Sequence, residues 1–491
     1  MRTVPVPDGR DSPPRDRPAR RALRVAGPEP GAYPPQAGPR RPDRAGRAEA
    51  EAAITAARTA FDTTGWSRDA SPRSRALNEL ADRVAERLPD MARTLARENG
   101  KLLAQTTWEV TLSVEWLRYS AAAALMQIAG RAAEPTPGLY FHSSPEPMGV
   151  AGIITPWNSP VILLVRALGP AIGAGCTTVL KMPGQTALTN TLFAEAVAAT
   201  ESLPPGVVNL LTEAGNEVAP LLVESADVDV LSYTGSTHVG RAIAAAAAST
   251  LKRANLELGG KAPLVVFDDA DLDVVVPQLV TSSIAMNGQF CCTGSRVLAQ
   301  RGIADELRAR LAAALEAVKV GPAEDPSSQL GPLIDKAGVA RVDKIVEDAV
   351  DYAKVIVRGG PVTDSELAGG AYFRPALLEM ERLDVPLVQQ EVFGPVQTFE
   401  IFEDEADAVR RANATEFGLA AAVFTADDIR ARRVARDLRF GSIWLNTWGV
   451  MSEHFEQGGV KQSGYGMLCG PSAITEFQTL KAYSTAAPHP A

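Results

Sequence analysis

The sequence predicts an α/β protein of two or three domains built on parallel sheets. Its 491 residues, 46% hydrophobic and 22% charged, are more than one hydrophobic core usually organises. From about residue 150, short apolar and β-branched runs alternate with helical stretches, which is typical of βαβ units. A second such series begins at 263–267 and extends to about residue 446, so we expect a second domain to begin near Gly259.

The predicted elements follow from hydrophobic spacing. Apolar residues recur from Leu77 to Leu95 at intervals of three and four, which predicts one long amphipathic helix. Buried strands are expected at 150–155, 177–181, 207–211, 228–234 and 263–267. Helices are expected at 189–199, 241–249 and 272–286.

Residues 1–45 differ from the rest of the chain. Prolines are interleaved with arginines and aliphatic clusters are absent, a composition that cannot bury a core. The proline density also forbids the amphipathic helix of a transit peptide, and there is no apolar centre of a secretory signal. We therefore expect a disordered tail, or else a mis-assigned translation start.

Composition excludes several classes of protein. No apolar run is long enough for a membrane-spanning helix, and a net charge of −9 offers no basic surface for nucleic acid. Two of the four cysteines are neighbours, so a disulfide framework is not expected. We therefore expect a reducing, cytoplasmic compartment. The four histidines are scattered, so no metal site is expected. Arginine far exceeds lysine, which suggests a bacterial, GC-rich coding sequence.

Two short segments contain candidate catalytic groups near predicted strand or helix ends. In 287–296, a cysteine pair next to glycine is a candidate reactive thiol, but two small buried thiols are favoured on this segment alone. In 256–261, Glu257 lies between leucines, where desolvation would raise its pKa towards that of a general base. A water-exposed glutamate at a strand end is an equal alternative.

Two further segments suggest binding functions. Asn158 is held between two prolines at a strand end, where its amide can donate to a developing oxyanion, although ordinary turn chemistry is commoner. The glycine-containing segment 234–240 precedes an alanine-rich helix, whose first backbone amides can hold a phosphate. A glycine turn with a serine or threonine cap explains that segment equally well.

In the order and spacing of these segments, the chain from about residue 48 to residue 483 resembles the NAD(P)-dependent aldehyde dehydrogenase superfamily. The matching motifs are ITPWNSP at 154–160, KMPGQT at 181–186, TGSTHVG at 234–240, LELGGK at 256–261, GQFCCTGSR at 288–296, EVFGPV at 391–396, FGLAAAVFT at 417–425, GSIWLN at 441–446 and GGVKQSGYG at 458–466. The family's N-terminal strands are not found in the first 45 residues. The resemblance implies a Rossmann-like cofactor domain, a second α/β catalytic domain and a small β oligomerisation arm.

The resemblance also implies a reaction, the oxidation of an aldehyde to a carboxylic acid with NAD or NADP. It makes Cys291 the nucleophile and Cys292 a bystander, with the oxyanion held by Asn158 and the Cys291 backbone N–H. Glu257 would activate Cys291 and then the water that hydrolyses the thioester. The alternatives are a coenzyme A-acylating semialdehyde dehydrogenase, which the presence of Glu257 disfavours, and a non-catalytic protein of the same fold.

The cofactor residues implied by the resemblance lie in four of the motifs. They are Ile154, Thr155, Trp157, Lys181, Gly184, Gly235, Ser236, Gly240, Glu391 and Phe393. Gly184 departs from NAD-preferring members, which commonly carry a glutamate here that holds the ribose hydroxyls and repels a 2′-phosphate. Its loss makes NADP or dual use possible, and Gly184→Glu is expected to shift preference towards NAD.

Arg166, Met451 and Gln457 are expected to line the aldehyde funnel. An arginine at the position of Arg166 also occurs in succinic-semialdehyde and lactaldehyde dehydrogenases, where it can meet an anionic or hydroxylated substrate, yet some aromatic-aldehyde members carry one too. A solvent-facing helix arginine is the alternative. Glu456 and Gln457 replace the family's usual Pro-Phe, which argues against a purely aliphatic pocket.

The resemblance also sets the expected domain boundaries. The cofactor domain is expected at 46–127 and 148–258, the catalytic domain at 259–446, the arm at 128–147 and 473–491, and a funnel and linking segment at 447–472. Arm strands that cross between subunits would cover strand edges that a monomer leaves unpaired. We therefore expect a homodimer or homotetramer whose substrate is a small-molecule aldehyde.

Overall fold

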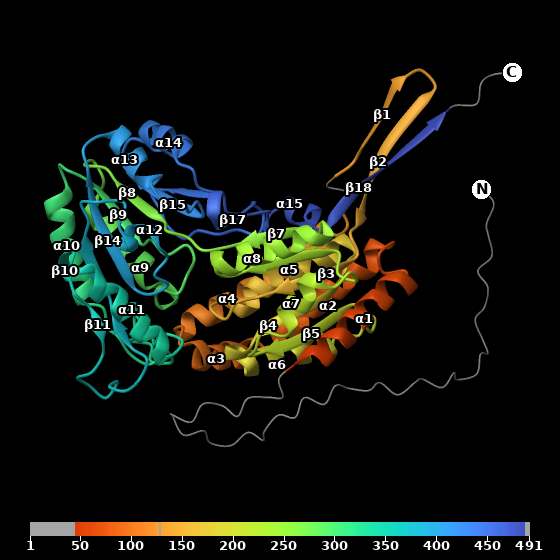
Figure 1. The fold of residues 1–491 in the computed structure, drawn as a ribbon, viewed down its shortest axis with the longest axis horizontal. Coiled ribbons are helices and arrows are strands. Elements are labelled where there is room, and N and C mark those ends of the chain that lie inside the picture. The colour runs from red at the N-terminus through yellow and green to blue at the C-terminus, as the bar shows by residue number, and fades with distance from the viewer. Residues whose placement is uncertain (1–44, 127–128, 487–491) are drawn as a thin grey trace, which may run out of the picture. The chain divides into compact units, whose positions relative to one another are not determined.

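The computed structural model describes residues 45–126 and 129–486 and has the predicted α/β architecture (Figure 1). Two large sheets of mostly parallel strands are flanked by helices, and a three-stranded antiparallel sheet forms a separate arm. The tail expected at 1–45 lies outside the described residues except for its last position. No helix in the described ranges has the length and apolarity needed to cross a membrane.

The first sheet has the strand order β17-β7-β6-β3-β4-β5. Its strands are β3 (Val150–Ile154), β4 (Thr177–Pro183), β5 (Val208–Glu213), β6 (Val230–Thr234), β7 (Arg253–Glu257) and β17 (Gly464–Tyr465). All neighbours pair in parallel except β17, which runs antiparallel to β7. The chain moves outward from β3 to β5 and then returns to the other side of β3, so the crevice between β3 and β6 is the switch point where such sheets bind ligands.

The helices of this part connect or cover these strands. They are α1 (Arg47–Thr63), α2 (Ala70–Glu86), α3 (Leu88–Asn99), α4 (Leu103–Ala123), α5 (Pro160–Ala174), η1 (Gly184–Thr186), α6 (Ala187–Ala198), α7 (Val218–Glu224), α8 (Thr237–Ala247) and η2 (Ala248–Thr250). The predicted strands and the helices at 189–199 and 241–249 are confirmed, with small differences at their ends.

The single helix predicted across Leu77 and Leu95 is wrong, because α2 and α3 are separate helices that break at Arg87. Pro89 lies in the first turn of α3, where its missing N–H costs nothing. Within one continuous helix the same ring would clash with the carbonyl of the preceding turn.

The second sheet has the order β10-β13-β14-β9-β8-β15-β16, parallel except for β10. Its strands are β8 (Pro263–Val266), β9 (Arg296–Gln300), β10 (Lys354–Val357), β13 (Ala376–Glu379), β14 (Val396–Phe402), β15 (Ala420–Phe424) and β16 (Ser442–Leu445). Around it lie α9 (Leu272–Ile284), η3 (Ala285–Gly288), α10 (Ala304–Glu316), α11 (Lys336–Ala349), α12 (Pro386–Gln389), α13 (Glu405–Ala412), α14 (Asp428–Asp437) and the small pair β11 (Gly360–Pro361) and β12 (Phe373–Arg374).

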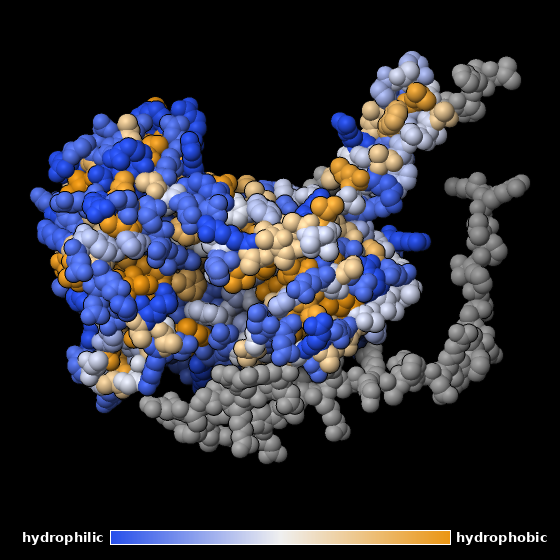
Figure 2. All heavy atoms as spheres, in the orientation of Figure 1, coloured by the Kyte–Doolittle hydropathy of each residue, from blue (hydrophilic) through white to orange (hydrophobic). Residues whose placement is uncertain are grey.

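The arm is an antiparallel sheet of order β1-β2-β18, made of β1 (Arg131–Thr136), β2 (Leu139–Pro147) and β18 (Gln478–Ala486). The C-terminal strand begins later than the expected residue 473, because α15 (Ser472–Thr475) precedes it. Exposed apolar side chains lie on the arm, among them Leu139, Phe141 and Leu480 (Figure 2). One further short helix, η4 (Lys461–Ser463), precedes β17.

Candidate active site

Asn158 lies in the loop between the buried strand β3 and helix α5. Pro160 occupies the first helical position, where its missing N–H is not needed, and Ser159 is the N-cap residue. The Asn158 side chain is buried and donates from Nδ2 to the Gln289 backbone oxygen over 3.0 Å. Since an amide nitrogen carries two hydrogens, one donor remains available to a ligand.

Cys291 and Cys292 lie in the loop 289–295, called the cysteine loop below, between η3 and β9. Its direction is determined by three consecutive residues in left-handed conformation that follow the end of α9. Met286, Asn287 and Gly288 have φ angles of 50°, 60° and 71°. The Asn287 side chain holds this turn, because Nδ2 donates to the backbone oxygens of Gly100 (2.9 Å) and Pro332 (2.8 Å). A Cβ at Gly288 would lie 2.3 Å from the Gly394 carbonyl carbon, so only glycine fits this approach.

Cys291 and Cys292 both line one cavity, with their sulfur atoms 4.0 Å apart. Neither residue is fully buried, unlike Cys176 and Cys469, so the interpretation as two small buried thiols is wrong. The hydrogen bond with Cys291, together with desolvation of the Cys292 sulfur, holds the pKa of Cys292 well above its ordinary value. Cys292 is therefore a neutral thiol that can donate to the Cys291 sulfur.

Glu257 is the last residue of β7 and is only 8% exposed, so the alternative of a water-exposed strand end is wrong. Burial raises its pKa from 4.5 to about 7, against the opposing charge of Arg166. Its Oε1 atom has no hydrogen-bond partner among the described residues. A buried carboxyl with such a pKa is suited to act as a general base near neutral pH.

The two glycines after Glu257 bring its strand end against the neighbouring loops. A Cβ at Gly260 would lie 2.3 Å from the Cys291 backbone oxygen, and one at Gly259 would lie 2.4 Å from Glu391 Oε2. Glu391 Oε1 accepts a hydrogen bond from the Gly260 backbone N–H over 3.1 Å. The absence of side chains here therefore permits the contact between the β7 end, the cysteine loop and the segment that contains Glu391.

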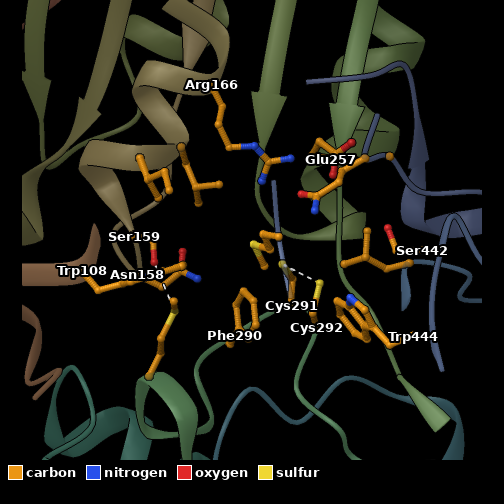
Figure 3. A pocket seen from close by; sticks show the side chains of 17 residues that line it. Trp108, Asn158, Ser159, Arg166, Glu257, Phe290, Cys291, Cys292, Ser442 and Trp444 are labelled. Carbon is orange, nitrogen blue, oxygen red and sulfur yellow. Dashed lines mark hydrogen bonds between the residues drawn. The ribbon is translucent and has the colours of Figure 1, made fainter. Parts of the chain in front are cut away.

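One cavity gathers the predicted catalytic and substrate residues (Figure 3). Asn158, Arg166, Glu257, Cys291, Met451 and Gln457 all line it. Sequence reasoning missed its aromatic walls, which include Trp108 from α4, Phe290 and Trp444. Phe290 directly precedes Cys291 in its motif and Trp444 lies in the motif GSIWLN, so the sequence offered a signal for both. Trp108 lies in α4, far from these motifs in the sequence, and no pattern indicated it.

Arg166 extends from α5 towards this cavity and is 8% exposed, so the solvent-facing alternative is wrong (Figure 3). Its Nε has no hydrogen-bond partner in the described ranges, and no carboxylate there lies within ion-pair distance of it. Glu257 is the carboxylate whose charge acts on it most. A buried guanidinium without a paired carboxylate favours an anionic ligand.

Gln457 and Glu456 point to different surroundings. Gln457 lines the cavity, and its Oε1 lies 3.7 Å from the Cys469 sulfur. Glu456 instead accepts hydrogen bonds from the Ser472 backbone N–H (3.2 Å) and hydroxyl (2.8 Å). Of the two departures from the usual Pro-Phe, Gln457 is the one that adds a polar group to the cavity wall.

Next to this cavity lies a second, smaller one, lined by Glu391 and Phe393. Phe290 lines both. Phe393 contacts Trp157 edge to face, with ring centroids 5.6 Å apart. Burial raises the pKa of Glu391 to about 7. The structure thus places Trp157, Glu391 and Phe393 together, beside the cysteine loop.

The remaining predicted cofactor residues lie mostly at the carboxyl ends of β3, β4 and β6, around the switch point. Ile154 and Thr155 end or follow β3, Lys181 is on β4, and Gly235 and Ser236 follow β6. Ser236 caps α8, accepting from the Val239 N–H over 3.4 Å. Gly240 has a packing role, because a Cβ there would lie 2.4 Å from a Leu258 methyl carbon.

Gly184 begins η1, close to Lys181 and against the segment after β5. A Cβ at Gly184 would lie 2.6 Å from the Ala214 Cβ and 2.8 Å from its Cα. Because the second of these is a backbone atom, a larger residue at 184 requires the chain to move. The expectation that Gly184→Glu simply restores a ribose-binding carboxylate is therefore revised.

A model of the aldehyde dehydrogenase family matches residues 40–483. The chain belongs to this family. Succinate-semialdehyde dehydrogenase of Paenarthrobacter nicotinovorans is 36% identical over 90% of this chain and 97% of its own length. 3-Sulfolactaldehyde dehydrogenase of Pseudomonas putida is 34% identical over 89% of each chain. The crystal structure of betaine aldehyde dehydrogenase from Staphylococcus aureus with NAD+ superposes with a TM-score of 0.88 at 32% identity, covering 91% of this chain and 89% of that one.

The predicted class of enzyme is thereby confirmed. This aldehyde dehydrogenase oxidises an aldehyde to a carboxylic acid with NAD or NADP. The residues at the switch point fit a dinucleotide. The start of α8, capped by Ser236, suits the pyrophosphate. Trp157, Phe393 and Glu391 lie beside the cysteine loop, where the nicotinamide end would have to reach the reacting carbon. When bound, the dinucleotide accepts the hydride that the oxidation releases.

Proposed function

We propose that this aldehyde dehydrogenase oxidises a small aldehyde that carries an anionic group, with Cys291 as nucleophile, Glu257 as general base and Asn158 as oxyanion donor. The single observation that supports the substrate class is Arg166, a buried guanidinium that faces the catalytic cavity without a carboxylate partner in the described part of the chain. A substrate carboxylate or sulfonate would supply the missing negative charge.

In the proposed reaction, the Cys291 thiolate attacks the carbonyl carbon and forms a thiohemiacetal. Its oxyanion accepts hydrogen bonds from the free Asn158 amide hydrogen and from the Cys291 backbone N–H. After the hydride has left the same carbon, a thioester remains on Cys291. Glu257 then takes a proton from water, the water oxygen bonds to the thioester carbon, and the carbon–sulfur bond breaks to release the carboxylic acid.

Several relatives support the anionic class of substrate. Enzymes named for succinate semialdehyde, glutarate semialdehyde and 3-sulfolactaldehyde, all anionic aldehydes, match most of the chain. Betaine aldehyde dehydrogenases match too, but the cation of betaine aldehyde would be repelled by Arg166. The coenzyme A-acylating alternative remains disfavoured, because Glu257 lines the cavity and can activate water there.

Steady-state kinetics with three short aldehydes test this proposal. Succinate semialdehyde, uncharged butanal and cationic betaine aldehyde differ mainly in charge, and we expect kcat/KM to fall in that order. Arg166→Gln should reduce kcat/KM for succinate semialdehyde by about 100-fold and that for butanal by only a few-fold, since a buried charge pair is lost in one case alone. The exposed Arg436→Gln is the matched control. Equal losses for both aldehydes would contradict the anionic class.

We also propose that the enzyme is a cytoplasmic homodimer or homotetramer with the domain boundaries expected from the sequence, except that the C-terminal arm strand begins at Gln478. The four cysteines are free thiols, as a reducing compartment maintains them. β1 and β18 form the two edges of the arm sheet and pair on one side only within the described residues. A partner subunit would cover such an edge.

A further inference from the structure

Glu213 and Lys181 project from the same face of the first sheet at neighbouring strand ends. β4 and β5 are parallel neighbours, with Lys181 opposite Leu211 and Pro183 opposite Glu213. Because alternate residues of a strand point to the same side, Lys181 and Glu213 share one face. This face carries the core of Ile154, Val179, Leu211, Val218 and Ile243, and so it is the face covered by α1, α7 and α8.

The Glu213 carboxylate is fixed and only half satisfied. Its residue is 2% exposed, and Oε1 accepts from the backbone N–H groups of Glu217 and Val218, the second over 2.7 Å. Oε2 is buried and has no hydrogen-bond partner among the described residues. A carboxylate oxygen that has lost water without gaining a donor is costly, which indicates a place for a ligand donor.

Charge couples this carboxylate to the predicted cofactor lysine. Burial lowers the pKa of Lys181, and Glu213 is the charged group that opposes this shift. Gly184, three residues after Lys181, is packed against Ala214, the residue that follows Glu213. Ala214 thus occupies the space that a side chain at 184 would need, and the preceding residue, Glu213, places a carboxylate next to this position.

We propose that Glu213 selects NAD over NADP. This inference rests on the dinucleotide occupying the switch point of the first sheet, as the residues there suggest. Oε2 accepts a hydrogen bond from the 2′-hydroxyl of the adenosine ribose, and the negative charge opposes the 2′-phosphate of NADP. Lys181 alone would attract that phosphate, and Glu213 offsets the attraction. The enzyme is therefore an NAD enzyme although Gly184 lacks a carboxylate.

Binding of the two dinucleotides, measured by calorimetry without aldehyde, tests this role. We expect the wild-type enzyme to bind NAD at least 30-fold more tightly than NADP. Glu213→Gln keeps an oxygen acceptor for the α7 amides but loses the charge, and it should reduce the ratio to 3-fold or less. Glu217→Gln makes the same charge change four residues later, in the exposed loop that follows β5, and should leave the ratio unaltered.

Three results would overturn the assignment: a wild type without preference for NAD, a Glu213→Gln enzyme with an unaltered ratio, or an equal shift in Glu217→Gln. If Glu213→Gln does not fold, Lys181→Met provides the second test, because loss of the phosphate-attracting cation should raise the NAD to NADP ratio at least 3-fold. An unchanged or lower ratio would reject the proposal. Since no aldehyde is present, these results are independent of the substrate class proposed above.

Discussion

Lys101 and Glu109 form an ion pair that is buried beneath the first turn of α5, the helix that begins two residues after Asn158. Glu109 Oε1 accepts from the Val161 and Ile162 N–H groups over 3.0 and 3.3 Å, and Lys101 Nζ also donates to Ser159 Oγ over 3.1 Å. The side chain of the N-cap residue Ser159 makes no capping hydrogen bond to α5, so Glu109 of α4 takes this role by accepting from the first free N–H groups of the helix. The pair fixes the loop that presents the Asn158 amide.

Glu109→Gln should lower kcat and destabilise the fold, because it leaves Lys101 buried without its counter-charge, a cost of about 3–5 kcal/mol. Lys101→Met with Glu109→Gln should cost less than the sum of the single changes, as urea unfolding will show. If Glu109 acts through Asn158, Glu109→Gln should cause no further loss of kcat in an Asn158→Ala background. An additive loss there would make the pair merely structural.

This ion pair shows where prediction from sequence ends. Buried strands such as β3 and β4 were predictable because fully apolar runs carry their own signal, and the motif around Cys291 gave the reacting groups. For Glu257 and Arg166 the sequence left a buried and an exposed alternative open, because burial there depends on how β7 and α5 pack against other parts of the chain. Likewise, the approach of Glu213 to Lys181 depends on strand register, which no local pattern specifies.

Cys291→Ala should abolish aldehyde oxidation while dinucleotide binding remains measurable, because the proposed carbon–sulfur bond cannot form. Cys292→Ala should keep most activity, since Cys292 is a neutral thiol whose role is to contact the Cys291 sulfur. Initial rates and calorimetric titration of the two variants provide the comparison. The reverse pattern would transfer the nucleophile to Cys292.

Removing the edge of the arm should change the assembly. Deletion of 478–486 removes β18, which pairs with β2 along its whole length. We expect multi-angle light scattering to give a dimer or tetramer mass for the full chain and a smaller mass for the shortened one. A monomer mass for the full chain at micromolar concentration would refute the proposed assembly.

Glu257 should control the pH dependence of deacylation. Its carboxylate is the active form, so with a pKa of about 7 the hydrolysis rate should fall as the pH decreases through 7. Glu257→Gln should accumulate an acyl-enzyme that intact mass spectrometry detects after mixing with aldehyde and cofactor. Wild-type turnover without acyl-enzyme in this variant would remove Glu257 from the mechanism.

The raised pKa of Glu257 also predicts how the stability of the fold depends on pH. An ordinary ion-paired glutamate stabilises the fold more as the pH rises, whereas Glu257 should do the opposite. The folded protein favours the neutral carboxyl, so the stabilisation is fully present below pH 4.5 and is lost as the pH rises through about 7. Glu257→Gln is neutral at every pH and should therefore gain stability over wild type between pH 5 and pH 8, approaching about 3 kcal/mol. Urea unfolding at both pH values measures this gain. A variant that is less stable than wild type at pH 8 would show that ionised Glu257 is held favourably, by Arg166 or by water, and that burial does not dominate its titration.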